Sequence, residues 1–77
     1  MVPIHQMSPG SRGSLVSVGG ARGFRRRLME MGLLPGTPVR LVRWVGIGDL
    51  LEVEVRGSHV SLRSADAAQL LVQPEGA

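Results

Sequence analysis

The sequence predicts a mainly β fold, in which five short strands form a small barrel and a short helix follows the first strand. Three observations support this prediction. Apolar and polar residues alternate in short runs, as they do in half-buried strands. Glycine and proline residues separate these runs, which is typical of strands joined by turns. The chain has 77 residues, 43% of them hydrophobic, which is enough for one domain with an aliphatic core.

The composition narrows the classes of function. The chain contains no cysteine, so neither a disulfide framework nor a thiolate metal site is available. All nine basic residues are arginines, and the formal net charge is +3. Arginine favours carboxylate and phosphate partners, although a GC-rich genome or a thermophilic origin produces the same bias. The six carboxylates are spread along the chain, which predicts no large field of a single sign.

The sequence also predicts a cytoplasmic protein. Residues 1–10 lack the charged start and apolar run of a signal peptide. No apolar stretch approaches the roughly 20 residues that a membrane-spanning helix requires. We therefore expect no membrane insertion, with recruitment to the inner face of the cytoplasmic membrane through a partner.

The ends of the chain are expected to lie outside the domain. Residues 1–10, which are interrupted by prolines, are predicted to form a loosely ordered N-terminal lead-in, from which Ile4 and Met7 can pack on the core. The domain is placed at residues 11–73. Residues 74–77 are predicted to form a C-terminal tail, because Pro74 ends the ordered chain.

The first strand is predicted at residues 14–18, and the Gly19-Gly20 pair ends it. The glycine-rich stretch 18–24 between this strand and a helix invites comparison with a nucleotide-binding loop. Its spacing is not G-x-G-x-x-G, and no G-K-[ST] follows. We interpret it as a flexible connector.

A short helix is predicted around Phe24, Leu28 and Met31, because the i, i+4, i+7 spacing places these residues on one face. Gly32 occupies the position at which a left-handed residue ends a helix, and Leu33 is expected to pack back near Leu28. These residues predict both the helix and its end.

A turn and a bent strand are predicted next. Pro35-Gly36 fits a turn in which Pro fixes φ and Gly permits a positive φ. Residues 39–45 form a β-branched strand whose alternation slips at Val42, which predicts a bulge. Residues 46–49 form the loop that returns the chain.

A hairpin follows, because Leu51, Val53 and Val55 alternate with charged residues. A two-residue turn at Gly57-Ser58 is expected, and Val60 and Leu62 continue the inward face. This turn predicts that Val55 lies opposite Val60, that Arg56 lies opposite His59, and that Glu52 lies opposite Arg63.

The end of the domain is predicted as one helical turn and a last strand. Ser64 is expected to cap the turn at residues 65–69, with Asp66 near its positive end, and residues 70–72 form the strand. Small all-β domains of this kind remove exposed edges by closing into a barrel. An SH3-like barrel is the most economical interpretation.

The three consecutive arginines Arg25, Arg26 and Arg27 suggest contacts with nucleic-acid phosphates. Neighbouring residues on a helix are about 100° apart, so the three do not form one patch. Trp44 is the only plausible platform for a stacked base. Nucleic-acid binding is therefore not expected.

No catalytic or metal site is predicted. His5 and His59 are the only histidines, and neither has a second ligand at metal-site spacing. No nucleophile and base are placed to act together, so we expect no enzyme activity and no cofactor. An outward-facing His59 with Glu52 or Glu54 leaves open a surface site for Fe²⁺ or Zn²⁺.

Two apolar residues are expected to be exposed. Leu34 precedes Pro35 in a turn, and Ile47 lies at the tip of the 46–49 loop. If both lie near Trp44, they form a small contact patch for a partner.

Several blocks of the sequence resemble the signature of the ferrous iron transport protein A (FeoA) family. The first is RLMEMGLLPGTPV at residues 27–39. The later blocks, in family order, are GDLLEV at 48–53, VRG at 55–57, VSLR at 60–63, AA at 67–68 and LLV at 70–72. The resemblance extends from Met7 to Val72.

This resemblance implies an SH3-like barrel in the cytoplasm beside FeoB, a membrane protein that imports Fe²⁺ and carries a GTPase domain. It implies that the chain binds and modulates the cytoplasmic part of this transporter. Arg26, Leu34, Pro35 and Trp44 are the predicted contact residues. Two alternatives remain open: a module that binds a divalent transition metal directly, and an RNA- or DNA-binding barrel.

Overall fold

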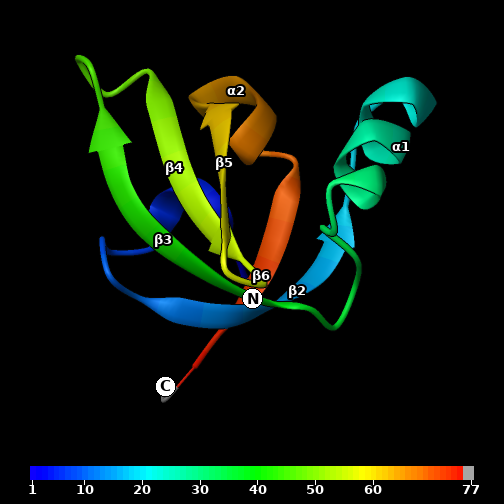
Figure 1. Ribbon diagram of the computed structural model, residues 1–77, viewed down its shortest axis with the longest axis horizontal. Coiled ribbons are helices and arrows are strands. Elements are labelled where there is room, and N and C mark those ends of the chain that lie inside the picture. The colour runs from blue at the N-terminus through cyan, green and yellow to red at the C-terminus, as the bar shows by residue number, and fades with distance from the viewer. Residues whose placement is uncertain (76–77) are drawn as a thin grey trace.

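The computed structural model describes residues 1–75 of the chain and shows a curved sheet with a helix at one side (Figure 1). The elements in chain order are β1 (Val2–Pro3), the 3-10 turn η1 (Ile4–Gln6), β2 (Arg12–Val18), α1 (Arg22–Glu30), β3 (Pro38–Val45), β4 (Leu50–Val55), β5 (Ser58–Arg63), α2 (Ser64–Ala67) and β6 (Leu70–Pro74). The six strands form one antiparallel sheet in the order β1-β6-β2-β3-β4-β5. The predicted mainly β fold is confirmed, with one strand more than expected.

Two bulges allow the sheet to curl around its own core. The register of β3 against β4 shifts between Leu41 and Arg43, which confirms the bulge predicted at Val42. A second shift lies in β2, between Leu15 and Ser17, and leaves Val16 exposed. An extra residue on one strand increases the local twist, so the strands bend and one face of the sheet encloses the interior.

The interior is aliphatic, as the composition predicts. It draws on every strand except β1, on both helices and on the loops, and its buried hydrophobic residues are Ile4, Met7, Leu15, Val18, Leu28, Leu33, Val39, Leu41, Leu51, Val53, Val55, Leu62, Ala67, Leu70 and Val72. Thr37 is the one buried polar residue among residues 1–75. In β4 the buried positions alternate with half-buried ones, as its sequence predicts.

The segment expected to be a loosely ordered lead-in is folded instead. Val2 and Pro3 pair with Val72 and Leu71 of β6, and Ile4 is fully buried. Met7 is also buried, so both apolar residues expected to reach the core do so. Burial of Ile4 and Met7 offsets the entropy lost on ordering these residues, and a sequence interrupted by prolines does not reveal this gain.

The register predicted for the β4–β5 hairpin is wrong, because the turn lies one residue earlier than expected and each cross-strand partner is shifted by two residues. The two turn residues are Arg56 and Gly57, with φ values of 52° and 80°, and Val55 lies opposite Ser58. A two-residue turn of the mirror-image type requires positive φ at both positions, and here an arginine adopts it. Glu52 therefore faces Ser61 rather than Arg63, and His59 faces Glu54 rather than Arg56.

The C-terminal end of α1 follows the predicted pattern. Gly32 has a φ of 97°, its N–H donates to the Met29 carbonyl, and the Leu33 N–H donates to the Leu28 carbonyl over 2.9 Å. This pair of bonds is the Schellman arrangement that ends a helix. Met31 departs from its predicted place on the buried face, because the chain has already left the helix there and the side chain is 48% exposed.

The second helix and the tail also differ from expectation. The predicted cap by Ser64 is wrong, because Ser64 is the first residue of α2, Arg63 occupies the N-cap position, and no side-chain hydrogen bond caps this helix. The strand β6 continues to Pro74, and the Glu75 N–H donates to the Arg12 carbonyl. Gly76 and Ala77, the rest of the predicted tail, lie outside the described residues.

Gly13 lets β2 and β6 approach closely, which yields a prediction for stability. A Cβ atom on Gly13 would lie 2.5 Å from a Val72 methyl carbon and 2.6 Å from the Gln73 carbonyl oxygen. We expect Gly13→Ala to lower the free energy of unfolding by about 1–3 kcal/mol, because the backbone of β6 must move. Urea denaturation measures this loss.

The matched control is Gly23→Ala in α1, where an added Cβ meets no heavy atom within 4 Å. This change should leave stability unchanged or raise it slightly, since alanine is the better helix former. A Gly13→Ala protein as stable as the wild type would contradict the packing argument.

Candidate functional site

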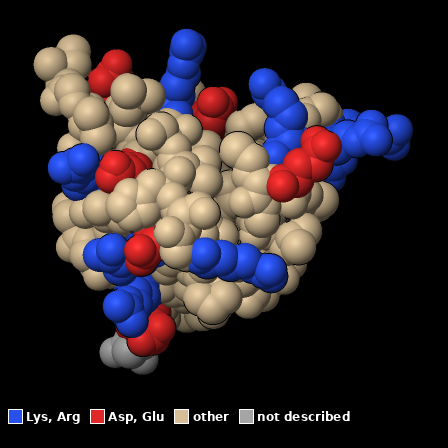
Figure 2. All heavy atoms as spheres, in the orientation of Figure 1, with Lys and Arg blue, Asp and Glu red and all other residues tan. Residues whose placement is uncertain are grey.

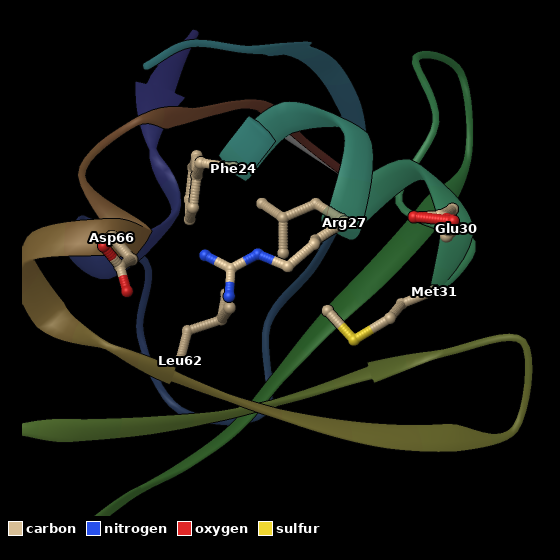
Figure 3. A pocket seen from close by; sticks show the side chains of 7 residues that line it. Phe24, Arg27, Glu30, Met31, Leu62 and Asp66 are labelled. Atoms are coloured by element: carbon tan, nitrogen blue, oxygen red, sulfur yellow. The ribbon is translucent and has the colours of Figure 1, made fainter. Parts of the chain in front are cut away.

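An open groove of about 470 Å³ lies between α1 and the β5–α2 side of the barrel (Figure 3). Its lining residues come from α1, the residue that follows α1, β5 and α2, and they are Phe24, Arg27, Leu28, Glu30, Met31, Leu62 and Asp66. Leu28 and Leu62 are buried and form its apolar floor, while Phe24 is half-buried. The groove can therefore receive an apolar side chain while water remains at its mouth.

The groove exists because α1 covers little of the barrel. Leu28 is the one buried residue of α1, and Figure 1 shows the helix standing at the side of the sheet. The loop after α1 supplies Leu33 to the core, so the Schellman turn anchors the helix at its C-terminal end. The rest of α1 is held mainly by Phe24 and Leu28.

Arginines dominate the surface of α1. Arg22, Arg25, Arg26 and Arg27 are all exposed, against the single acidic residue Glu30. No ion pair joins these arginines to any residue in the part of the chain that the structure describes. Figure 2 shows basic side chains projecting from the side of the molecule that α1 occupies.

Arg27 is the arginine that reaches the groove. Figure 3 shows its guanidinium extending over the groove, between Phe24, Leu62 and Asp66. A guanidinium offers five donors in a planar fork that matches a carboxylate or phosphate. The groove thus combines an apolar floor with a cationic group at its mouth.

The sequence-predicted contact residues do not form one patch. Arg26 lies on the exposed surface of α1, and Leu34 and Pro35 lie exposed in the turn after it. Trp44 lies near the far end of β3 and packs against the core. Leu34 precedes this strand, so Leu34 and Trp44 lie towards opposite ends of β3 and the condition for one patch of Leu34, Ile47 and Trp44 is not met.

The turn at Leu34 has the predicted geometry. Gly36 has a φ of 89°, and the Thr37 N–H donates to the Leu34 carbonyl over 3.0 Å. Leu34 is 39% exposed, whereas Ile47 at the other end of β3 is 99% exposed. The two apolar residues predicted to be exposed are exposed, but at opposite ends of one strand.

Sequence reasoning missed Arg27, Leu62 and Asp66 as members of one site. Leu62 was predicted to face the core and Asp66 to stabilise a helical turn, and neither role points to a groove. The alternation that buries Leu62 and the helical spacing of Phe24 and Leu28 were visible, but nothing local shows that the two faces meet.

Apart from the groove, a cluster of charged residues lies on the outer face of β3, β4 and β5. Arg40 Nε donates to Glu54 Oε1 over 2.9 Å, and Arg43 Nε lies 3.4 Å from Glu52 Oε1. The His59 imidazole lies between both carboxylates, with Nδ1 3.4 Å from Glu52 Oε1 and Nε2 3.7 Å from Glu54 Oε2. A protonated His59 can therefore form ion pairs with both.

The structure arranges no ready metal centre within residues 1–75, where no group of three or more His, Cys, Asp or Glu side chains could hold an ion. His5 lies in η1, and its Nδ1 atom is buried with no hydrogen-bond partner among these residues. His59 is the histidine that lies beside carboxylates, as the sequence suggested.

Arg40 controls the ionisation of Glu54. The hydrogen bond from Arg40, together with its charge, holds the pKa of Glu54 below its ordinary value against the opposing effect of partial burial. The same hydrogen bond raises the pKa of Arg40 above its ordinary value. Both shifts favour the charged pair, and both side chains remain about one-third exposed.

The geometry defines a class of protein: a small SH3-like barrel with an exposed basic helix and a groove beside it. A family model for the FeoA domain matches residues 2–74. The chain belongs to the FeoA family, which is associated with ferrous iron transport.

This chain is similar to known proteins in both sequence and structure. An Fe(2+) transport protein A/Fe(2+) transporter FeoB fusion protein of Porphyromonas gingivalis is 30% identical over 70 residues, which cover 91% of this chain but 8% of the fusion protein. The solution structure of FeoA from Chlorobium tepidum is 28% identical, with a TM-score of 0.92, over 97% of this chain and 71% of that one.

A third relative is the crystal structure of Stenotrophomonas maltophilia FeoA, an SH3-domain protein complexed with zinc. It is 25% identical, with a TM-score of 0.81, and the match covers 95% of this chain and 91% of that one. Of the helices that the structure describes, none is long and apolar enough to cross a membrane.

The Arg40–Glu54 pair predicts an acid dependence of stability. A carboxyl whose pKa is lower in the folded state than in the unfolded chain stabilises the fold above its unfolded pKa, and this contribution is lost as the pH falls through the folded pKa. We expect Glu54→Gln to flatten the fall in melting temperature across the acid range in which carboxylates titrate.

The control is Glu30→Gln, an exposed carboxylate of α1 that forms no ion pair among residues 1–75. Thermal unfolding followed by circular dichroism at a series of pH values measures the difference. Identical acid profiles for the wild type and Glu54→Gln would contradict a stabilising role for the ionised pair.

Proposed function

We propose that this chain is a non-catalytic regulator that binds an FeoB-type ferrous iron transporter and modulates it from the cytoplasmic side. The observation that carries the proposal is the P. gingivalis relative, in which an Fe(2+) transport protein A and the transporter FeoB form one chain. Fusion keeps two modules at a high effective concentration, so it favours pairs that act together. Two modules that act together also need surfaces that contact each other.

The α1 side of the barrel supports this proposal best. It carries the exposed basic helix, the groove and the exposed Leu34–Pro35 turn, which follows α1 directly in the chain. A partly exposed leucine beside a basic surface is typical of a protein contact, where an apolar centre is surrounded by charged groups. The proposal therefore places Arg26, Leu34 and Pro35 in the contact and leaves Trp44 outside it.

Direct binding of a divalent metal is a second proposal, and it depends on His59. Imidazole nitrogens and carboxylates are ligand types that suit Fe²⁺ or Zn²⁺, and the S. maltophilia FeoA is complexed with zinc. As arranged among residues 1–75, these side chains do not form a group that could hold an ion, so a metal would have to reposition them. In this chain a metal would compete with Arg40 and Arg43 for Glu54 and Glu52. The transporter proposal does not require such a site.

The transporter proposal predicts that the chain is retained by the immobilised cytoplasmic part of an FeoB-type transporter. We expect Leu34→Asp to weaken this binding by about tenfold or more, because it places a charge in the apolar part of the contact. A pull-down followed by titration calorimetry, with and without guanine nucleotide, measures the effect.

The matched control is Ile47→Asp, which makes the same kind of change at the other end of β3. Both substituted residues are exposed, so both variants should fold normally. No binding of the wild type in any nucleotide state would overturn the proposal, and equal losses in both variants would move the contact away from α1.

The metal proposal predicts that Fe²⁺ or Zn²⁺ raises the melting temperature and that His59→Ala removes this effect. Binding to the folded state alone stabilises by about 2.7 kcal/mol when the ligand is present at 100 times its dissociation constant. Mg²⁺ is the control metal, since it binds nitrogen ligands poorly. Unchanged melting with all three metals would refute direct binding at this surface.

A further inference from the structure

The groove beside α1 has a chemistry more specific than that of a general apolar contact. Its floor is made by Leu28 and Leu62, which are 3% and 5% exposed, and Met31 forms part of a more exposed wall. The Arg27 guanidinium extends over this floor (Figure 3). An occupant must therefore present an apolar side chain and, beside it, a group that accepts hydrogen bonds from a cation.

We infer that the occupant is an acidic, apolar-anchored segment of a partner protein, in which a Leu, Met or Phe side chain enters the groove and a neighbouring Asp or Glu pairs with Arg27. The inference rests on the proposed function, because it states the chemistry of the segment by which the transporter or another partner docks.

Charge complementarity carries this choice of occupant. The helix α1 presents four exposed arginines and one glutamate, and none of the arginines is paired with a carboxylate among residues 1–75. On the opposite outer face, by contrast, Arg40 and Arg43 are each paired with a glutamate. This basic charge lies on the helix that forms one wall of the groove, and Arg27 is the arginine that lines it. The four arginines of α1 outnumber the two carboxylates at the groove, Glu30 and Asp66, which favours a segment of opposite sign.

The same surface is less suited to nucleic acid. The floor of the groove is aliphatic, and Phe24 is the one aromatic residue that lines it. A nucleic-acid site would instead combine a continuous basic track with exposed stacking platforms. A segment with an apolar side chain and a neighbouring carboxylate uses both the apolar floor and the Arg27 guanidinium.

The helix α1 is attached to the barrel by few buried side chains. Only Leu28 of the helix is buried, so few contacts are lost if α1 moves against β5. A segment that fills the groove adds apolar contacts on both sides of it, and we expect α1 to become more protected from hydrogen exchange when the groove is occupied.

Two synthetic peptides test the inference on the intact chain. The acidic probe is an amphipathic peptide with leucines at helical spacing and glutamates elsewhere, and the basic probe replaces each glutamate with lysine. We expect the acidic probe to bind, with an affinity that falls as salt is raised, and the basic probe to be rejected. Fluorescence anisotropy of labelled probes measures both.

Two pairs of variants locate the contact. Arg27→Glu should weaken the acidic probe by about tenfold or more, whereas Arg25→Glu, the same change on the same helix outside the groove, should weaken it far less. Met31→Asn should weaken it by a similar factor, whereas Met29→Asn, at a comparably exposed methionine outside the groove, should not.

Several results would overturn the inference. The first two are equal binding of the acidic and basic probes, and equal losses of affinity in Arg27→Glu and Arg25→Glu. The third is duplex DNA that binds through Arg27 more tightly than the acidic probe does. The fourth is self-association in which the Ile47 loop of a second copy fills the groove and which Ile47→Asp abolishes. Transporter binding that survives Arg27→Glu and Met31→Asn would refute this inference alone. Probe binding without transporter binding would refute the proposed function alone.

Discussion

The structure depends on one sheet that buries its own apolar face. Bulges in β2 and β3 bend the strands, so that residues such as Leu15, Leu41 and Leu51 meet inside the barrel with almost no exposure. A domain of this size buries only about 60% of the surface that its unfolded chain exposes, so each buried aliphatic residue matters. The close approach of β2 and β6 at Gly13 is part of the same constraint, because a side chain there would clash with Val72 and the backbone of β6.

A sheet that encloses its own core does not need a covering helix. The helix α1 contributes one buried side chain and the loop after it contributes Leu33, and the rest of the helix remains at the surface. Because few of its side chains pack in the core, this helix can carry four arginines and line a groove. Because the core does not depend on most of α1, the same small domain can be stable and still present a basic surface that no carboxylate of the chain neutralises.

The charges are divided between two sides of the molecule with different consequences. On the outer face of β3, β4 and β5 the glutamates lie between arginines and His59, so the fold itself neutralises them. On α1 the arginines have no such partners within the described chain, and their charge is available to another molecule. Net charge alone does not distinguish these cases, since both sides contribute arginines to the same total.

Much of the fold could be predicted because local patterns specify it. The alternation in residues 51–55, the slip at Val42, and the sequence Met31-Gly32-Leu33 with its left-handed glycine each correspond to a structural feature that forms within a few residues. The predicted hairpin register is wrong because it does not depend on local patterns alone. Arg56 adopts a positive φ that sequence rules assign to glycine or asparagine, and cross-strand packing decides that one turn is better than its neighbour.

The barrel, the helix with its end and the aliphatic core follow from local sequence patterns, and the motif blocks identify the family. Three features could be seen only after the chain had folded: β1 pairs with β6, Leu34 and Trp44 lie apart, and Arg27, Leu62 and Asp66 share one groove. The two groups of features differ in the range of the interactions that produce them. Helix ends and turns are fixed by hydrogen bonds between near neighbours, whereas a groove between α1 and β5 exists only after distant segments have packed.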